Sequence, residues 1–313
     1  MSHKLSRRTL LAAPAILLVP RARAATTLRV GDQKGGVQAV MKAAGVLEDL
    51  PYRLEWNQFA AAAPVLEALN AGAVDTAFAG DAPVTFALAQ GVPARIVAAV
   101  RGTARATAIV VPGASTIRKP EDLRGKRIGT NRGSIGHALV LAAATRYGWS
   151  TTESRIVNLL PSDAKAALAG GSIDAWSSWN TYIAQAVLAD DGRVVLDGAG
   201  LLSGLSFQVA RTDAIDAKRA ELTDYIARIT RARLWALDNA AAYAKALATE
   251  INVTERVALW SIETDAARPV RVGAAVAADQ QRTADLYLGA KIIPQRLDVA
   301  GAFDSSFNPG FLA

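Results

Sequence analysis

Cysteine is absent from the 313-residue chain, and histidine occurs only twice, as His3 and His137. Without cysteine the protein forms no disulfide, has no thiolate for catalysis, and carries no lipid on a cysteine at a processed amino terminus. We expect no metal site, no cofactor and no lipid anchor.

The chain also has no apolar run long enough to cross a bilayer, because even the run at residues 10–19 falls short. The surroundings of this run are those of an export signal. Ala22-Arg23-Ala24 follows it as a small-residue cleavage site, and basic residues precede it, namely Lys4, Arg7 and Arg8. Because the two arginines stand directly before the apolar run, we predict that residues 1–24 are a twin-arginine signal. An ordinary secretory signal that contains two arginines is the alternative.

Little net positive charge remains once this segment is set aside. The whole chain has a formal net charge of +7, and residues 1–24 hold five basic residues and no acid, which leaves +2 for the remaining 289 residues. This balance gives no argument for a nucleic-acid partner. We expect a soluble protein exported to the periplasm, and the 51% of apolar residues is enough to fill the cores of two domains.

Strand-like runs alternate with helical patterns from the start of the remaining chain. Residues 28–31 are strand-like, residues 36–47 have apolar side chains at helical spacing, and residues 52–56 alternate again. This β-α-β order predicts a parallel sheet covered by helices.

The sequence also repeats itself weakly. The stretch VGDQKGG from Val30 matches IGTNRGS from Ile128 at an offset of 98, and EALNAGAVD from Glu67 matches AALAGGSID from Ala166 at an offset of 99. Two similar lobes would follow, with the carboxyl ends of their strands facing a shared cleft where ligands bind. The alternative is that such Val/Ile-Gly turns occur in any β-α unit.

Helix starts are the features that we expect at this cleft. Gly80-Asp81-Ala82-Pro83 follows a strand-like run and has the residues of a helix start near Ala82, while Ser134 is a predicted N-cap and Gly35-Gly36 begins the first helix. Free amides and the helix dipole at several such starts make an anion site. Side-chain donors stand beside them: Gln33, Ser134 and His137.

Three aromatic or titratable side chains near these starts have two interpretations each. The dipole holds His137 neutral, so its ring can donate a hydrogen bond to the anion, or the ring packs against the other lobe and caps a carbonyl. Trp176 and Trp179 follow a predicted strand, and we expect one to line the cleft and one to pack, although both could be core residues.

The helices predicted between Asp213 and Glu250 look structural, with an amphipathic, solvated face rather than a basic binding patch.

The stretches LRVGDQKGGVQAVMKAAGVLED, GDAPVTFALAQG, GSIGHALVLAA, DAWSSWNTY and ADLYLGAKIIPQRLDV resemble the aliphatic-sulfonate-binding proteins of ABC importers. The wider family also holds taurine-, nitrate- and thiamine-precursor-binding proteins. The resemblance runs from about Leu28 to Val299, and the order and spacing of the stretches carry it.

This resemblance implies an α/β fold, the two-lobed periplasmic binding protein of type II. Each lobe would be a mainly parallel sheet flanked by helices, with two crossings between the lobes. The first lobe would comprise residues 25–110 plus 208–313 and the second residues 111–207. The crossings would lie near residues 109–111 and 206–209.

The resemblance also implies a ligand site, without catalytic residues. Its members would be Gln33, Gly80, Asp81, Ala82, Ser134, His137 and Trp176. The sequence departs from the family pattern at two places that bear on the ligand's tail. Asp32 stands where the family often has Tyr, and Trp179-Asn180-Thr181-Tyr182 stands where Trp-Asp-Pro-Tyr is common.

The implied function is capture of an organosulfonate anion by a monomeric binding protein, which delivers it to a membrane permease with its ATPase for sulfur acquisition. Taurine, nitrate or a thiamine precursor are alternative ligands, and a sensory role leaves no mark in the sequence. An enzyme on the same scaffold is a further alternative. Cysteine chemistry of the sulfinate desulfinase kind is excluded, and Ser134 with His137 is the remaining candidate pair of nucleophile and base.

Overall fold

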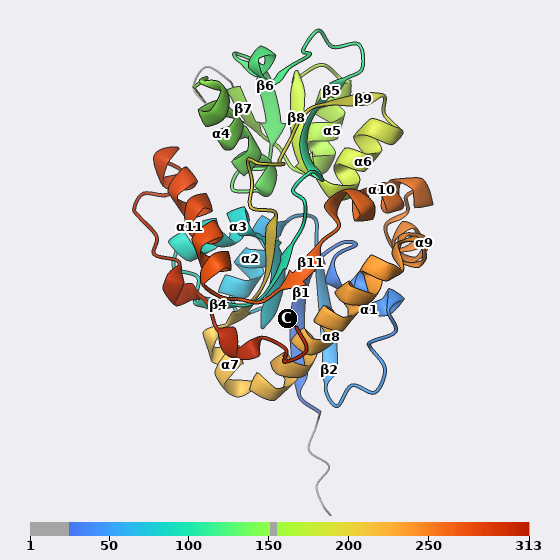
Figure 1. Cartoon of the computed structure of the whole chain (residues 1–313), viewed down its shortest axis with the longest axis vertical. Coiled ribbons are helices and arrows are strands. Elements are labelled where there is room, and N and C mark those ends of the chain that lie inside the picture. Colours follow the sequence, from blue (N-terminus) through green and yellow to red (C-terminus); the bar gives the residue numbers. More distant parts are fainter. Residues whose placement is uncertain (1–24, 151–154, 313) are drawn as a thin grey trace, which may run out of the picture.

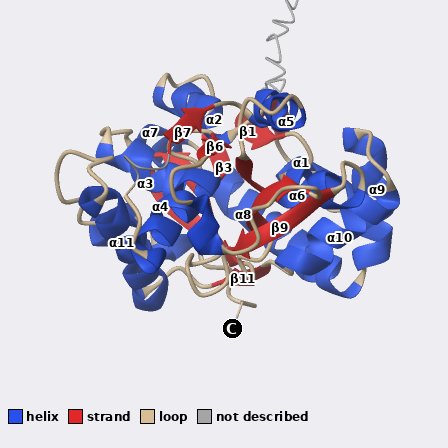
Figure 2. Cartoon of the chain, turned by 90° about the horizontal axis from the view of Figure 1, so that it is seen from above, coloured by secondary structure: helices blue, strands red, loops and turns tan. Residues whose placement is uncertain are grey.

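The computed structural model describes residues 25–150 and 155–312, which form two sheets surrounded by helices (Figures 1 and 2). The predicted export signal lies outside the described residues. Of the helices in the described part, none combines the length and the apolar character that a membrane crossing requires.

The first sheet has six strands, with a spatial order different from their order in the chain. Its members are β1 (Thr27–Gln33), β2 (Arg53–Phe59), β3 (Thr76–Gly80), β4 (Ala94–Arg101), β10 (Leu205–Arg211) and β11 (Arg268–Val270). They lie in the order β11-β4-β10-β3-β1-β2. Strands β1, β2, β3 and β4 point the same way, and β10 and β11 run against them.

The second sheet repeats this plan with five strands. Its members are β5 (Thr107–Pro112), β6 (Arg127–Thr130), β7 (Arg155–Asn158), β8 (Ala175–Trp179) and β9 (Gly192–Asp197). They lie in the order β7-β6-β8-β5-β9, with β6 parallel to β7 and β8 and with β5 antiparallel to both of its neighbours. In each sheet the strand that follows a crossing from the other half, β10 in the first and β5 in the second, is a reversed strand, and β11 is also reversed in the first. The predicted α/β architecture is therefore confirmed, with sheets that are mixed for this reason.

The weak sequence repeat is confirmed by the register of the strands. In the first sheet Val30 is level with Thr76, and in the second Ile128 is level with Ala175. These pairs are offset by 98 and 99 residues, which are the offsets of the two sequence matches. The two halves are therefore built on one β-α-β-α-β plan.

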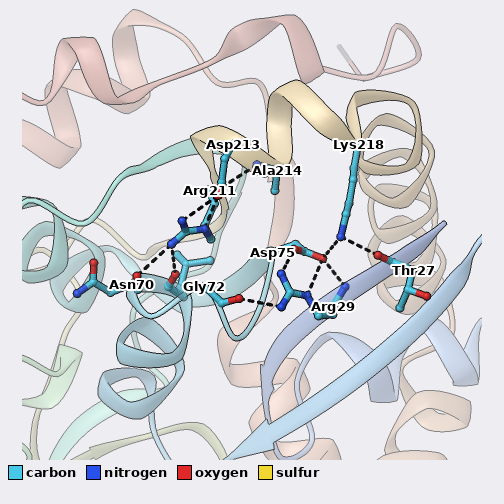
Figure 3. Close-up of polar contacts among 10 residues, drawn as sticks. Thr27, Arg29, Asn70, Gly72, Asp75, Arg211, Asp213, Ala214 and Lys218 are labelled. Carbon is cyan, nitrogen blue, oxygen red and sulfur yellow. Dashed lines mark hydrogen bonds and ion pairs between the residues drawn. The ribbon is translucent and has the colours of Figure 1, made fainter.

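The repeat extends to an ion pair that fixes the start of each plan, and Figure 3 shows the pair of the first half, between Arg29 and Asp75. Arg29 donates from Nη2 to Asp75 Oδ1 at 2.6 Å, and Arg127 donates from Nη2 to Asp174 Oδ1 at 2.8 Å. In each half the arginine backbone amide also donates to the same carboxylate, at 2.7 and 2.8 Å. The first half adds Lys218, whose Nζ lies 2.6 Å from Asp75 Oδ2. Asp75 is thus the more heavily bonded of the two carboxylates, and its side chain is 3% exposed against 31% for Asp174.

A helix follows β1, β2 and β3 in the first half and β6, β7 and β8 in the second. These are α1 (Val37–Ala43), α2 (Ala62–Asn70) and α3 (Asp81–Ala89) in the first, and α4 (Ile135–Tyr147), α5 (Pro161–Ala169) and α6 (Asn180–Leu188) in the second. A 3-10 turn, η1 (Pro120–Leu123), precedes β6. Apolar side chains of these helices pack on the two sheets and form separate cores in each half.

The chain passes between the halves at residues 102–106, which join β4 to β5, and at residues 198–204, which join β9 to β10. The predicted crossing positions, residues 109–111 and 206–209, lie a few residues further on, inside β5 and β10. The strand-like sequence of residues 109–111 and 206–209 therefore lies close to the crossings, but these residues pair with neighbouring strands of the sheets.

The carboxyl-terminal third is mostly helical and touches both halves. Its elements are α7 (Thr212–Ala217), α8 (Arg219–Asp238), α9 (Ala240–Ile251), α10 (Glu255–Asp265), α11 (Ala274–Gly289), η2 (Ala300–Ala302) and η3 (Ser305–Phe307). Helix α8 packs on α1, whereas α10 packs on α6 of the second half and leads within three residues to β11 of the first sheet. Because α10 also packs on α9, which packs on α1 of the first half, this helix contacts both halves beside the two chain crossings.

Candidate functional site

A cavity of about 650 Å³ lies between the two halves. The starts of five helices border it, because the carboxyl ends of β1, β2, β3, β6 and β8 all face this space. The lining residues at these starts are Gln33, Lys34, Gly35 and Gly36 (α1), Ala60 and Ala62 (α2), Gly80 and Pro83 (α3), Ser134 and Ile135 (α4), and Trp179, Asn180, Thr181 and Tyr182 (α6). Helix starts from both halves thus converge on one cavity, as the sequence predicts.

Three of the seven predicted site residues, Gln33, Gly80 and Ser134, line this cavity together. Ser134 is the N-cap of α4, and its Oγ accepts a hydrogen bond from the backbone amide of His137 at 3.1 Å. The amide of Ile135 has no hydrogen-bond partner within residues 25–150 and 155–312, as expected in the first turn of a helix. Helix α4 therefore offers the cavity a free donor.

The start of α1 is different, because Asp32 already occupies it. Its carboxylate accepts hydrogen bonds from the amides of Gln33 (2.9 Å) and Gln38 (2.8 Å) and is 0% exposed. Burial raises the pKa of Asp32 to about 6, against the lowering effect of these amides and of the nearby positive charge of Arg233. One of the helix starts predicted to form the anion site thus binds the protein's own carboxylate. Gln33 and Gly35 beside it still line the cavity.

Asp81 and Ala82 lie at the start of α3 but do not line the cavity. Both are buried, and the Asp81 carboxylate accepts hydrogen bonds from Ser203 Oγ at 2.5 Å, Thr283 Oγ1 at 2.9 Å and the Ala82 amide at 2.7 Å. Burial raises the pKa of Asp81 despite these donors. Asp81 therefore ties the start of α3 to the second crossing, through Ser203, and to α11, through Thr283.

His137 also points away from the cavity and is 3% exposed. Its Nδ1 accepts a hydrogen bond from the Gly133 amide at 3.1 Å, and its ring centroid lies 6.2 Å from that of Tyr287 on α11. Burial, with a smaller effect of the Arg132 charge, lowers the pKa of His137 to about 4. The ring is thus a neutral packing residue against the other half, which was one of its two interpretations, although it accepts from an amide rather than capping a carbonyl.

The two tryptophans divide as expected, but the residue that the resemblance assigned to the site is the one that packs. Trp176 is 1% exposed and lies in the core of the second half, whereas Trp179 lines the cavity. Side chains three positions apart in a strand point to opposite faces, so only one of the pair can reach the cleft. The aromatic wall of the cavity is therefore Trp179, with the ring of Tyr182 edge-on to it at 6.0 Å between centroids.

Arg233 of α8 is a cavity residue that the sequence interpretation missed. Its guanidinium Cζ lies 4.5 Å from the ring centroid of Phe78, which also lines the cavity. Its Nε is buried without a hydrogen bond, and no described residue forms an ion pair with it. The sequence interpretation took this helix as structural, with an amphipathic, solvated face, and did not place Arg233 at the cavity. A signal existed, since Arg233 follows the buried Ile226 and Ile229 at helical spacing and so falls on the apolar stripe.

The far end of the cavity is formed by the turn from α10 to β11. Its charged members are Glu263, Asp265 and Arg268. No sequence motif marks this turn. Together with Lys34 and Arg233 at the other elements, it makes the lining rich in charges of both signs.

Comparison with known proteins agrees with this geometry. Residues 53–226 match the family described as NMT1/THI5 like. The alkanesulfonate-binding protein SsuA from Xanthomonas axonopodis pv. citri, bound to MOPS, is 31% identical with a TM-score of 0.84, and the match covers 90% of this chain and 99% of that one. The periplasmic aliphatic sulphonate binding protein SsuA from Escherichia coli is 29% identical with a TM-score of 0.80, over 89% and 92% of the two chains. The taurine-binding periplasmic protein of Escherichia coli (strain K12) is 34% identical over 144 residues, which is 46% of this chain and 44% of that one.

Proposed function

The chain belongs to the NMT1/THI5-like family, and from this we propose that it is the solute-binding protein of an ABC importer, which captures an organosulfonate in the cavity between its halves. The observation that carries the proposal is the convergence of helix starts from both halves, with the unpaired Arg233, on a single cavity.

The chemistry of this lining suits a sulfonate group. A sulfonate carries one negative charge on three oxygens, and the free amide of Ile135, the side chains of Gln33 and Ser134 and the guanidinium of Arg233 are donors at hand. Arg233 adds a full positive charge, where the sequence alone offered only neutral donors. Gly80 has no side chain, so the backbone at the end of β3 can approach the anion closely.

The size of the cavity indicates an organic tail. A volume of about 650 Å³ falls in the range of sites for organic ligands, and nitrate or sulfate would leave most of it unfilled. Apolar and aromatic side chains supply the walls that such a tail needs. They include Phe78, Trp179, Tyr182, Leu247 and Ile251.

Transport follows from closure of the two halves over the ligand. A ligand that contacts both halves at once stabilises the closed form, and a hinge at the passages between the sheets allows it. In this proposal the two lobes are residues 25–110 with 208–313 and residues 111–207, as the sequence predicts, except that the start of β5 from Thr107 belongs to the second lobe and the start of β10 from Leu205 to the first. The protein acts as a monomer in the periplasm after export, and its closed form delivers the ligand to the permease and its ATPase.

An enzyme on this scaffold is the less favoured alternative. Ser134 Oγ accepts a hydrogen bond from a backbone amide, and His137 Nδ1 accepts one from Gly133, so within residues 25–150 and 155–312 the imidazole is not hydrogen-bonded to the hydroxyl. A nucleophile and its general base need that contact. Binding without turnover is therefore the function that the site supports.

Ligand screening with the chain from residue 25 onward tests the proposal. We expect alkanesulfonates to raise the melting temperature with concentration, because a ligand that binds only the folded state stabilises it. Sulfate, nitrate and a carboxylate of the same length are the controls for the anionic group, and an aminopyrimidine is the control for a thiamine precursor. A shift with nitrate or the pyrimidine, and none with any sulfonate, would refute the sulfonate assignment.

A further inference from the structure

The carboxylate of Asp32 lies directly behind the wall of the cavity. It is 0% exposed, and its Oδ1 occupies the space that a side chain at Gly36 would need. Gly36 itself lines the cavity, as does Gln33, which follows Asp32 in the chain. The backbone at Gly36 therefore separates a buried negative charge from the ligand space, and glycine is the residue that leaves room for both.

Backbone amides, rather than a cation, hold this carboxylate in place. The amides of Gln33 and Gln38 donate to it, and no described residue forms an ion pair with it. Amide donors stabilise an anion without cancelling its charge. The start of α1 is thus satisfied by Asp32, and the negative charge of Asp32 still acts on its surroundings.

Three side chains of α8 and α9 interact electrostatically with Asp32. The positive charge of Arg233 lowers the pKa of Asp32, and the charge of Asp32 acts in turn on the phenols of Tyr225 and Tyr243. Burial raises the pKa of both phenols, to about 12 for Tyr243, so both are neutral near neutral pH. Because Arg233 lines the cavity and its field reaches Asp32, an anion bound beside Arg233 lies in the field of Asp32 as well.

Asp32 brings the charges around the cavity into balance. The described charged residues of the lining are three cations and two acids, namely Lys34, Arg233, Arg268, Glu263 and Asp265. The carboxylate behind the wall adds a third negative charge. With equal numbers of both signs, the site has no excess positive charge to balance a second negative charge on a ligand.

We propose that Asp32 is a specificity-determining residue, whose negative charge behind Gly36 restricts the cavity to monoanionic groups and disfavours dianions. The inference rests on the proposed function and assigns its charge selectivity to one residue, at a position where this chain departs from the family pattern. At an effective dielectric constant of about 20 and a separation of about 10 Å, each negative charge on the ligand weakens binding roughly tenfold. A dianion is therefore weakened roughly hundredfold by the same carboxylate.

Two ligands of nearly the same tetrahedral shape test this selectivity. Methanesulfonate carries one negative charge, and sulfate carries a second one on the oxygen that replaces the methyl group. Their affinities are measured by competition against 1-propanesulfonate in isothermal titration calorimetry. At about pH 8 we expect Asp32→Asn to bind methanesulfonate roughly tenfold and sulfate roughly hundredfold more tightly than the unchanged protein does.

The unchanged protein gives the same test through pH, so the test holds even if Asp32→Asn fails to fold. Burial raises the pKa of Asp32 to about 6, so the carboxylate is charged at about pH 8 and mostly neutral at about pH 5. Lowering the pH over this range should tighten sulfate binding roughly hundredfold and methanesulfonate binding roughly tenfold. In Asp32→Asn this dependence should disappear. Asp265→Asn is the matched control, because Asp265 lines the cavity and burial raises its pKa too, and we expect this variant to keep the dependence.

The outcomes separate this inference from the proposed function. A folded Asp32→Asn that binds both ligands equally well as before, or both more weakly by the same factor, overturns the inference and leaves Asp32 as a cap of α1. Loss of the pH dependence in Asp265→Asn but not in Asp32→Asn overturns the assignment to Asp32. Equal sulfate binding by the unchanged protein at both pH values overturns the inference as well. Absence of 1-propanesulfonate binding overturns the proposed function itself.

Discussion

Replacement of Arg233 by glutamine removes the only described positive charge that lines the cavity from α8, and it tests the anion site directly. The variant keeps a polar side chain beside Phe78 and changes only the charge and the hydrogen-bonding fork. Because no described residue forms an ion pair with Arg233, its loss leaves no salt-bridge partner behind. The bound anion would lose one charge-assisted interaction of about 1.5–3 kcal/mol, so we expect the Kd for 1-propanesulfonate to rise roughly 10- to 150-fold.

The assay is calorimetric titration near neutral pH, with thermal unfolding of the ligand-free variant as the check on folding. Arg231→Gln is the matched control on the same helix, because Arg231 is exposed and lies over the ring of Phe311, at 5.8 Å from its centroid. We expect this control to bind as the unchanged protein does. A folded Arg233→Gln whose Kd stays within about threefold of the original would refute the place of Arg233 in the anion site.

Three further predictions concern stability. Asp75→Asn should lower the free energy of unfolding by about 3 kcal/mol and Asp174→Asn by about 1 kcal/mol or less, because the first carboxylate is buried between two cations and the second forms a more exposed single pair. Urea denaturation measures both losses, and equal losses would contradict this ranking. Burial lowers the pKa of His137 to about 4, so the unfolded chain binds a proton that the folded chain does not, and stability should fall by about 3 kcal/mol as the pH drops from about 6.5 to 4. The acid loss should be smaller in His137→Asn, and an unchanged pH profile would exclude this residue as its source. Gly136→Ala should lower the free energy of unfolding by about 1–3 kcal/mol and weaken ligand binding, because the new methyl group would lie 2.7 Å from a carbonyl oxygen of β8. At Gly289 a methyl group meets no neighbouring atom, so Gly289→Ala should be neutral or stabilising. Thermal unfolding of the two variants measures the difference.

Local chemistry explains the part of the site that could be predicted from the sequence. Gln33, Gly80 and Ser134 stand at strand-to-helix turns, and such turns are specified by residues close together in the chain, as the N-cap hydrogen bond of Ser134 illustrates. The register of the repeat then brings turns from the two halves to the same edge of their sheets. The fold class followed from the same β-α order.

The direction in which a side chain points was harder to predict, because it depends on what lies opposite. Trp176 and His137 are near the right turns but face the core and the other half, respectively. Arg233 and Asp265 come from a region without a motif, and only the packing of α8 and α10 brings them to the cavity. The position of Arg233 on the apolar stripe of α8 was a signal in the sequence, because a charged residue on a buried face needs a polar neighbour or a ligand.

Helix α10 packs on α9 and on α6, and this contact with both halves restricts how the molecule can open. The two chain crossings alone would permit both bending and torsion of one half relative to the other. A helix that rests on both halves at a further point resists torsion, so opening becomes a bending motion about one axis close to the two crossings and this helix.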